Sequence, residues 1–409
     1  MVIVVVFGGT LLASVLISDL SRRSVASTAV LFLIAGVIAG PVFGLIDLGP
    51  GDERTKLLIE VTVFATLFVE GNKVNLAQTW RDPLPLRALL VGMPLTWVGI
   101  ALLAHFAIDV SWPEALLIGA VLSPTDVVFA RQLFAREGVP LRLRRFLSLE
   151  SGLNDGLALP LVVIMLDING REDLDLLRLA VEVVGGVALG IAVAFAGIWA
   201  ERPTRLGSAS LYEPLHGLAI AAITFGLAHL LDVNDFLAAF AAGITIAATN
   251  RTVASSLTAA AEPVVEALKL AALLIFGSLL TTTVISDFYL GGTLLVIGTL
   301  LVVRPLALGV ALLGTRLSMG VFGAAAWFGP RGFASVLYGL LVLGNGMERG
   351  EYLFHGIALV IASSMVLHSS TDALLARRLA NLSEEGPDDE VPDTQTSQKR
   401  EREEAAVEA

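Results

Sequence analysis

The chain has 409 residues, of which 55% are hydrophobic and only 16% are charged, and its formal net charge is −11. Soluble globular domains are about a quarter charged, so this composition, with a mean hydropathy of +0.79, excludes a water-soluble domain as the body of the protein. Apolar runs of about 20 residues, the length that crosses a bilayer, recur from end to end, and the predicted fold class is an all-α polytopic protein embedded in membrane lipid.

Thirteen apolar segments predict thirteen transmembrane helices. They cover about residues 1–20, 25–45, 56–70, 86–107, 114–135, 145–166, 176–199, 213–231, 236–250, 259–281, 288–314, 320–343 and 351–377. The first segment has no basic leader and no small-residue cleavage site, so we interpret it as a membrane helix rather than a signal peptide.

The distribution of basic residues predicts the orientation of the chain. With the N-terminus outside, the loops on the inner side hold sixteen Lys and Arg residues and the outer loops hold five. Cytoplasmic loops are the ones enriched in Lys and Arg. Because an odd number of spans places the termini on opposite sides, the bias predicts an outer N-terminus and a cytoplasmic C-terminus.

The C-terminal segment 381–409 differs from the rest of the chain, with ten acids and three bases. So few large apolar residues cannot bury enough surface to fold, and we expect a disordered cytoplasmic tail, too short to bind a nucleotide.

Cysteine is absent and the five histidines show no metal-ligand spacing, so we expect no cofactor, nucleotide or nucleic acid. His216 and His229 are candidates to tune a pH response, although lone membrane histidines are more often structural.

Segment 114–135 contains "VLSPTDVVFA", in which Pro124 lacks an N–H and predicts a break near Ser123. Thr125 and Asp126 would then begin the inner half-helix, because both are strong N-cap residues and a carboxylate there meets the positive end of the helix dipole. The unwound backbone would leave the Thr125 carbonyl available as a ligand.

Segment 320–343 contains a second break, at "WFGPRGFASV", where Gly329, Pro330 and Gly332 weaken the helix and Arg331 adds a charge. Each break falls in the fifth span of its half. Interrupted helices at matching positions indicate an inverted-repeat transporter with a midplane site. Two ordinary proline kinks are the alternative, but opposite buried charges at matched positions favour repeats at about 1–170 and 213–378, linked by a helix at 176–199.

Segment 145–166 carries a polar stripe within "LSLESGLNDGLALPL". Residues four apart share a helix face, so Ser151 and Asp155 stack on one line, and Glu150 and Asn154 on the adjacent line. A charge at the bilayer centre costs about 2.5–3.5 kcal/mol on insertion scales. Polar contacts that hold helices together are the alternative, but two acids beside an unwound helix exceed what such contacts need.

The stripe suits a small hard cation, because such ions prefer oxygen ligands. Asp155 offers carboxylate oxygen, Ser151 a hydroxyl and Thr125 a carbonyl. A carboxylate held in a low-dielectric cavity can bind either Na⁺ or H⁺, but not both. This competition is the simplest chemistry for an exchanger.

Arg304, in "LVVRPLALGV", is the only strong base in the middle of segment 288–314. An unpaired buried arginine is too costly to tolerate, so we pair it with Glu150. We expect the pair to be structural, and the loss of one partner to cost about 3–5 kcal/mol.

Four motifs together resemble the signature of the monovalent cation:proton antiporters. They are "SPTD" (123–126), "ESGLND" (150–155), "RP" (304–305) and "GPRG" (329–332). More narrowly, residues 1–378 are similar to the NhaP-type sodium/proton exchangers of the CPA1 branch. The resemblance implies a thirteen-helix inverted repeat with a six-helix core domain and a dimerisation domain, usually a homodimer, in the inner membrane of a prokaryote.

The resemblance also implies roles for the site residues. Asp155 would be the main carrier of cation and proton, and the Na⁺ ligands would be Asp155, Asp126, Ser151 and Thr125. Asn154 would orient the site.

Glu70, in "LFVEGNKVN", matches a family acid that reaches the cation through water, and an ordinary glutamate at a cytoplasmic helix end is the alternative. Two departures from the family pattern concern selectivity. Val127 replaces the usual proline after the TD pair, and the string around Arg331 reads GPRG where a GGLRG-like string is commoner. Neither removes a ligand, but both leave the preference among Na⁺, Li⁺ and K⁺ open.

Electrogenic relatives have Asp-Asp where this chain has Asn154 and Asp155. An uncharged Asn154 predicts one cation exchanged for one proton. The predicted function is therefore electroneutral antiport of Na⁺ or Li⁺ for H⁺ by alternating access. A K⁺/H⁺ antiporter is the nearest alternative, followed by a sodium-coupled organic-anion symporter, which would need a larger polar pocket in the second half. A channel or an intramembrane enzyme has less support.

Overall fold

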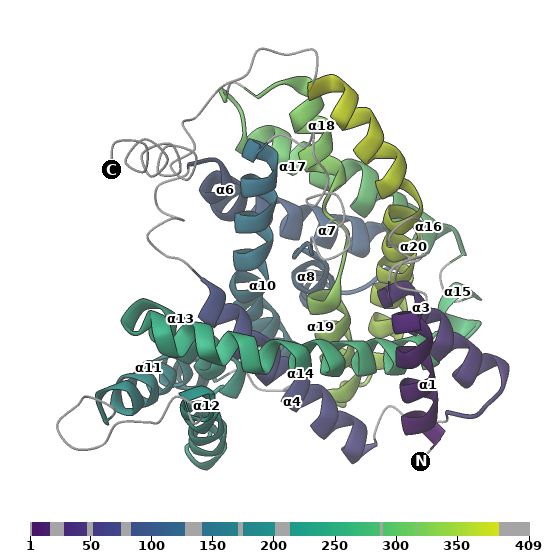
Figure 1. Cartoon of the computed structure of the whole chain (residues 1–409). Coiled ribbons are helices and arrows are strands. Elements are labelled where there is room, and N and C mark those ends of the chain that lie inside the picture. Colours follow the sequence, from purple (N-terminus) through teal and green to yellow (C-terminus); the bar gives the residue numbers. More distant parts are fainter. Residues whose placement is uncertain are drawn as a thin grey trace, which may run out of the picture.

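A computed structural model describes residues 2–16, 28–46, 52–74, 83–126, 141–170, 175–200, 213–286, 289–315 and 317–383 (Figure 1). Within these ranges every regular element is a helix. Five helical stretches are long and apolar enough to cross a membrane: Pro83–Ile108, Leu143–Gly170, Leu177–Ala200, Leu290–Ala311 and Gly350–Thr371. Shorter apolar helices lie between them.

The first half of the chain forms helices that follow the predicted segments. They are α1 (Val2–Leu16), α3 (Thr28–Val37) with the π-helical η1 (Ile38–Val42), α4 (Glu53–Lys73), α6 (Pro83–Arg87), η2 (Ala88–Gly92), α7 (Met93–Ile108), α8 (Trp112–Leu122) and α10 (Leu141–Gly170). Helix α4 is longer than the predicted segment 56–70, because its polar ends continue the helix beyond the apolar run.

Helix α11 (Leu176–Ala200) follows, and the rest of the chain begins after it. This remaining part contains α12 (Glu213–Leu230), α13 (Asp235–Thr249), α14 (Arg251–Ser278), α15 (Thr283–Ser286), α16 (Tyr289–Ile297), η3 (Gly298–Val303), α17 (Arg304–Ala311), α18 (Met319–Trp327), α19 (Phe333–Gly344) and α20 (Gly350–Ser383). Helix α20 runs past the predicted end at 377, and the rest of the segment assigned to the acidic tail lies outside the described residues.

Helix α14 begins well before the predicted start at residue 259. The side chain of Asn250 accepts hydrogen bonds from the backbone N–H groups of Thr252 and Val253 and so caps the helix immediately after α13. Hydropathy alone did not indicate this polar first turn.

The helices pack into two groups (Figure 1). One group contains α4 and α11 to α14, with α3 against the end of α14 and α1 against α3, and the other contains α6 to α8, α10 and α16 to α20. Helices α10 and α19 connect the groups through contacts with α4, α13 and α14. Close approach is possible because of glycines: a Cβ on Gly156 of α10 would overlap the ring of Phe240 on α13.

Both predicted helix breaks fall where the two groups meet. Helix α8 ends at Leu122 and residues 123–126 are not helical, while residues 127–140 lie outside the described residues. Helix α18 ends at Trp327 and α19 begins at Phe333, so residues 328–332 form the break expected from Pro330 and its glycines.

Candidate cation site

The two breaks contact each other directly. The backbone N–H of Asp126 donates to the carbonyl of Pro330 at 2.9 Å, and the N–H of Phe333 donates to Oδ2 of Asp126 at 3.1 Å. Asp126 therefore binds the first turn of α19, where the free N–H groups and the helix dipole favour a negative charge. The contact requires Gly332, because a Cβ there would overlap the carboxylate of Asp126.

Arg331 does the reverse at the end of α8. Its side chain is fully buried, and Nη1 donates to the carbonyls of Ser123 and Pro124 at 3.1 and 3.2 Å. Carbonyls at a helix C-terminus lack partners within the helix and carry partial negative charge. The charge that the sequence places in the second break therefore stabilises the first one, while the backbone N–H of Arg331 donates to Oγ of Ser364 at 2.9 Å.

Helix α10 brings the polar stripe against the unwound residues. Nδ2 of Asn154 donates to the carbonyl oxygen and to Oγ1 of Thr125, at 2.9 and 2.8 Å. Asn154 thus fixes the backbone at the end of α8, and Ser151, one turn earlier on α10, is also buried. The stripe faces the break rather than lipid.

Asp155 is the acid of the polar stripe that lies next to Asp126. Its Oδ1 is buried and makes no hydrogen bond to any described residue, and its carbonyl accepts from the Tyr338 hydroxyl at 2.8 Å. Asp126, Glu70 and Lys269 lie close enough to act on its charge. A buried carboxylate oxygen without a partner, next to a second acid, is able to bind a cation or a proton.

The expected pair of Glu150 and Arg304 is present. Nη1 and Nη2 of Arg304 donate to the two carboxylate oxygens at 3.1 Å each, and both side chains are buried. Nη2 also donates to the carbonyl of Ala325 at 3.3 Å, which ties the pair to α18. This bidentate geometry uses both oxygens of Glu150, so that Glu150 holds helices together beside the site.

Glu70 sits in an ion pair that the sequence did not predict. Its Oε1 accepts from Nζ of Lys73 at 3.4 Å and from Nζ of Lys269 at 3.2 Å. Lys269, on α14, is only 6% exposed and lies 5.9 Å from the ring centre of Phe333. The available signal was a single lysine within the apolar string "EALKLAALL", but only the packing of α4 against α14 places it beside the acids.

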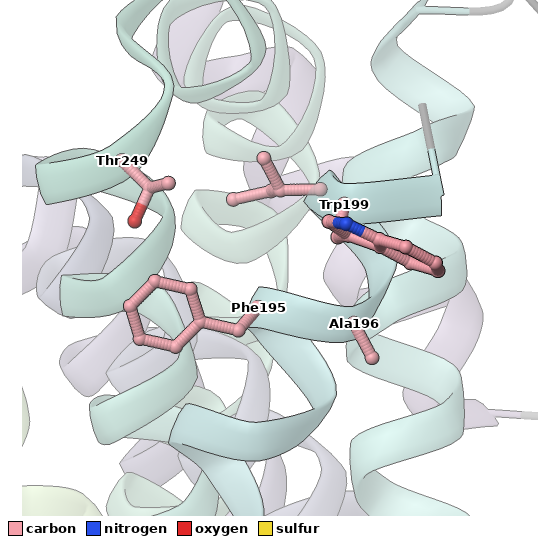
Figure 2. A pocket seen from close by; sticks show the side chains of 5 residues that line it. Phe195, Ala196, Trp199 and Thr249 are labelled. Atoms are coloured by element: carbon pink, nitrogen blue, oxygen red, sulfur yellow. The ribbon is translucent and has the colours of Figure 1, made fainter. Parts of the chain in front are cut away.

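An apolar hollow lies elsewhere, between α11 and α13 (Figure 2). Phe195, Trp199 and Thr249 line it with Ala196 and Ile198, and its volume is about 290 Å³. None of its lining residues is Asp126, Ser151, Asn154 or Asp155, and none is charged. We therefore do not assign this hollow to the cation.

A family model for the transmembrane sodium/hydrogen exchangers matches residues 9–377. The chain belongs to this sodium/hydrogen exchanger family. The match covers both helix breaks and the buried residues Asp126, Glu150, Asn154 and Asp155 beside them.

Several curated relatives of the chain are named antiporters. The K⁺/H⁺ antiporter NhaP2 of Shewanella sp. (strain MR-4) is 24% identical over 389 residues, which cover 91% of this chain and 66% of the relative. The K⁺/H⁺ antiporter NhaP of Alkalimonas amylolytica is 23% identical over 401 residues, covering 95% and 69%. The chain therefore spans about two thirds of the length of these curated relatives.

The fold also matches a solved structure. The sodium proton antiporter MjNhaP1 from Methanocaldococcus jannaschii superposes with a TM-score of 0.74 at 16% identity, covering 93% of this chain and 100% of that one. At this identity the likeness shows the shared fold.

Proposed function

We propose that this protein is a secondary active antiporter that exchanges a monovalent cation, Na⁺ or Li⁺ before K⁺, for H⁺. The observation that carries the proposal is the buried Oδ1 of Asp155, which has no hydrogen-bond partner among the described residues and lies beside Asp126 and the unwound end of α8. Oxygen ligands of this kind suit a hard cation. The proposed ligand set is completed by Ser151, Asp126 and Thr125. Asn154 already donates to both oxygens of Thr125, the carbonyl and Oγ1.

Exchange follows from competition at Asp155. With the site open to the inside, Na⁺ binds the carboxylate and displaces its proton; the group of helices that carries the site then moves against the group containing α4, α13 and α14. Outside, Na⁺ leaves and a proton returns. The empty site does not cross, because the negative charges of Asp155 and Asp126 would have to be desolvated together without a cation or a proton to balance them.

Glu70 enters this mechanism in a changed role. The resemblance implies an acid that reaches the cation through water, but Oε1 of Glu70 accepts from two lysines. We propose that Glu70 holds Lys269 near Asp155 and Asp126, and that it contacts a passing cation only through its other oxygen.

We further propose the finer topology of thirteen spans in two inverted repeats whose broken helices cross, at about 1–170 and 213–378. Two matched features support it. The breaks at 123–126 and 328–332 meet, and π-helical turns precede Pro94 and Pro305 in the fourth span of each half. A proline leaves a carbonyl without its helical partner, and a wider turn accommodates it.

The assembly and its place in the cell are also proposals. We infer a homodimer in the inner membrane of a prokaryote, with the N-terminus outside and the C-terminus in the cytoplasm, from the family resemblance and the bias of basic residues. Single cysteines introduced into this cysteine-free chain test both proposals. Crosslinking between protomers tests the dimer, and labelling with a thiol reagent that cannot cross the membrane tests the side on which each loop lies.

The direct test is transport in proteoliposomes with an internal pH dye. Addition of Na⁺ or Li⁺ outside should drive protons out and raise the internal pH, in a saturable manner. If none of Na⁺, Li⁺ and K⁺ changes the internal pH, antiport is contradicted. A response to K⁺ alone would favour the second candidate, a K⁺/H⁺ antiporter, which the names of the Shewanella and Alkalimonas relatives support.

A further inference from the structure

Three potential metal ligands from distant parts of the sequence meet where the N-terminal half of α4 approaches the end of α12 and the beginning of α13. They are Glu60, His229 and Asp235, and one ligand atom from each lies within 4.8 Å of the other two. Nε2 of His229 lies 2.9 Å from Oε1 of Glu60. Both side chains are partly exposed, so that an ion in solution can reach them.

The imidazole of His229 faces an oxygen acceptor on each side. Its Nδ1 lies 3.1 Å from the carbonyl of Phe225, one turn earlier on α12, and its Nε2 faces the carboxylate of Glu60. A neutral imidazole has a single N–H. If the N–H is on Nδ1 and donates to the Phe225 carbonyl, the lone pair of Nε2 points at a carboxylate oxygen of Glu60. Two acceptors in this position repel each other unless a positive charge lies between Nε2 and the carboxylate.

Asp235 supplies a third acceptor in the same place. Its Oδ2 is buried and makes no hydrogen bond to any described residue. The residue lies in the first turn of α13, which Asn234 fixes by accepting from the N–H of Leu237. The nearby Arg178 is paired with Glu182 and Asp232, and no described Lys or Arg forms an ion pair with Glu60 or Asp235.

We propose that Glu60, His229 and Asp235 form a site for a divalent transition metal of the Zn²⁺ class. One imidazole and two carboxylates, with a fourth position open to water, is a ligand set that Zn²⁺ accepts. The donation from Nδ1 to a backbone carbonyl is the arrangement that orients metal-binding histidines. Zn²⁺ ligands at bond lengths of about 2.0–2.1 Å lie roughly 3.3 Å apart, which the three side chains reach by small rotations.

A proton shared by His229 and Glu60 explains less of this arrangement than a metal ion does. It would satisfy that pair but leave Oδ2 of Asp235 without a partner, whereas a metal ion engages all three groups. Mg²⁺ and Ca²⁺ prefer sites made of oxygen alone, so the imidazole selects for a transition metal. The ion would tie the beginning of α13 to α4 and to the end of α12.

Titration of the purified protein with Co²⁺ tests the proposal, after removal of any polyhistidine tag. Four-coordinate Co²⁺ absorbs visible light far more strongly than the hydrated ion. We expect a saturable absorption band at one Co²⁺ per chain, which added Zn²⁺ abolishes and Mg²⁺ does not. The variants His229→Gln, Glu60→Gln and Asp235→Asn should each lose the band, or weaken binding at least tenfold.

His105→Gln is the matched control. Nδ1 of His105 also contacts a backbone carbonyl, that of Val110, and its ring stacks on Trp112, but no described carboxylate pairs with it. This variant should bind Co²⁺ as the unchanged protein does. Thermal unfolding without metal shows whether each variant is folded. Absence of the band in the unchanged protein, its persistence in all three site variants, or its equal loss in His105→Gln would overturn the site.

Discussion

At the scale of single residues, charged side chains in this protein satisfy helix ends. Asp126 binds the first turn of α19, and Arg331 binds the carbonyls of Ser123 and Pro124, immediately after the end of α8. Each charge compensates the end of a helix to which it does not belong, and so its burial is tolerated. Asp155 differs, because one of its oxygens has no described hydrogen-bond partner.

Lys269 provides the first test at this scale. Its buried ammonium lies near Asp155 and Asp126 and opposes a second positive ion there. In Lys269→Gln, the KM for Na⁺ at alkaline pH should fall several-fold in the proteoliposome assay. Lys73→Gln is the control, because Lys73 also pairs with Glu70 but is more exposed. An unchanged KM in Lys269→Gln, or the same fall in Lys73→Gln, would show that Lys269 does not act on the site.

The pair of Glu150 and Arg304 should contribute to stability rather than to exchange. Glu150→Gln or Arg304→Gln leaves a buried charge without its partner, and we expect a loss of about 3–5 kcal/mol. Denaturant unfolding in detergent measures it. Glu114→Gln removes the more exposed pair with Arg349 and should cost about 1 kcal/mol or less. Equal effects of the two substitutions would mean that the buried pair is not structural.

At the scale of helices, the contact between the two breaks depends on small residues. A Cβ on Gly332 would overlap the Asp126 carboxylate, whereas a Cβ on Gly323 of α18 would meet nothing within 4 Å. Gly332→Ala should therefore abolish exchange by displacing Asp126, and Gly323→Ala should leave transport unchanged. Exchange rates normalised to folded protein decide the matter. Normal transport by Gly332→Ala would show that exchange does not depend on the contact of Asp126 with the first turn of α19.

Much of the helix arrangement could be predicted from the sequence, because its causes are local. Apolar length indicated the helices, Pro330 and its glycines indicated the break before α19, and a lone Arg304 required an acid such as Glu150. The start of α14 was missed because a polar cap at Asn250, and not hydropathy, sets it.

Contacts between distant helices could not be predicted in this way. Lys269 is 199 residues from Glu70, and His229 is 169 residues from Glu60. Spacing along the chain carries no information on such pairs. They depend on which faces of α4, α12 and α14 pack together, and for this reason the histidine showed no metal-ligand pattern in the sequence.

At the scale of the whole molecule, the charge carried in each cycle should be zero. Asn154 is neutral and donates both of its described hydrogen bonds to Thr125, so we expect Asp155 to exchange one cation for one proton. A potential-sensitive dye in proteoliposomes should stay silent when Na⁺ is added, while the pH dye responds. A potential that develops with transport and grows with the Na⁺ gradient would contradict this stoichiometry.

The most direct measurement counts the protons released when Na⁺ binds to the purified protein in weakly buffered detergent solution. At a pH where the empty site holds its proton, we predict about one proton released per Na⁺ bound, because a carboxylate must lose its proton to bind a metal ion. Asp155→Asn should neither bind Na⁺ nor release protons, with its unfolding temperature preserved. Na⁺ binding without proton release, or undiminished release from Asp155→Asn, would contradict the account.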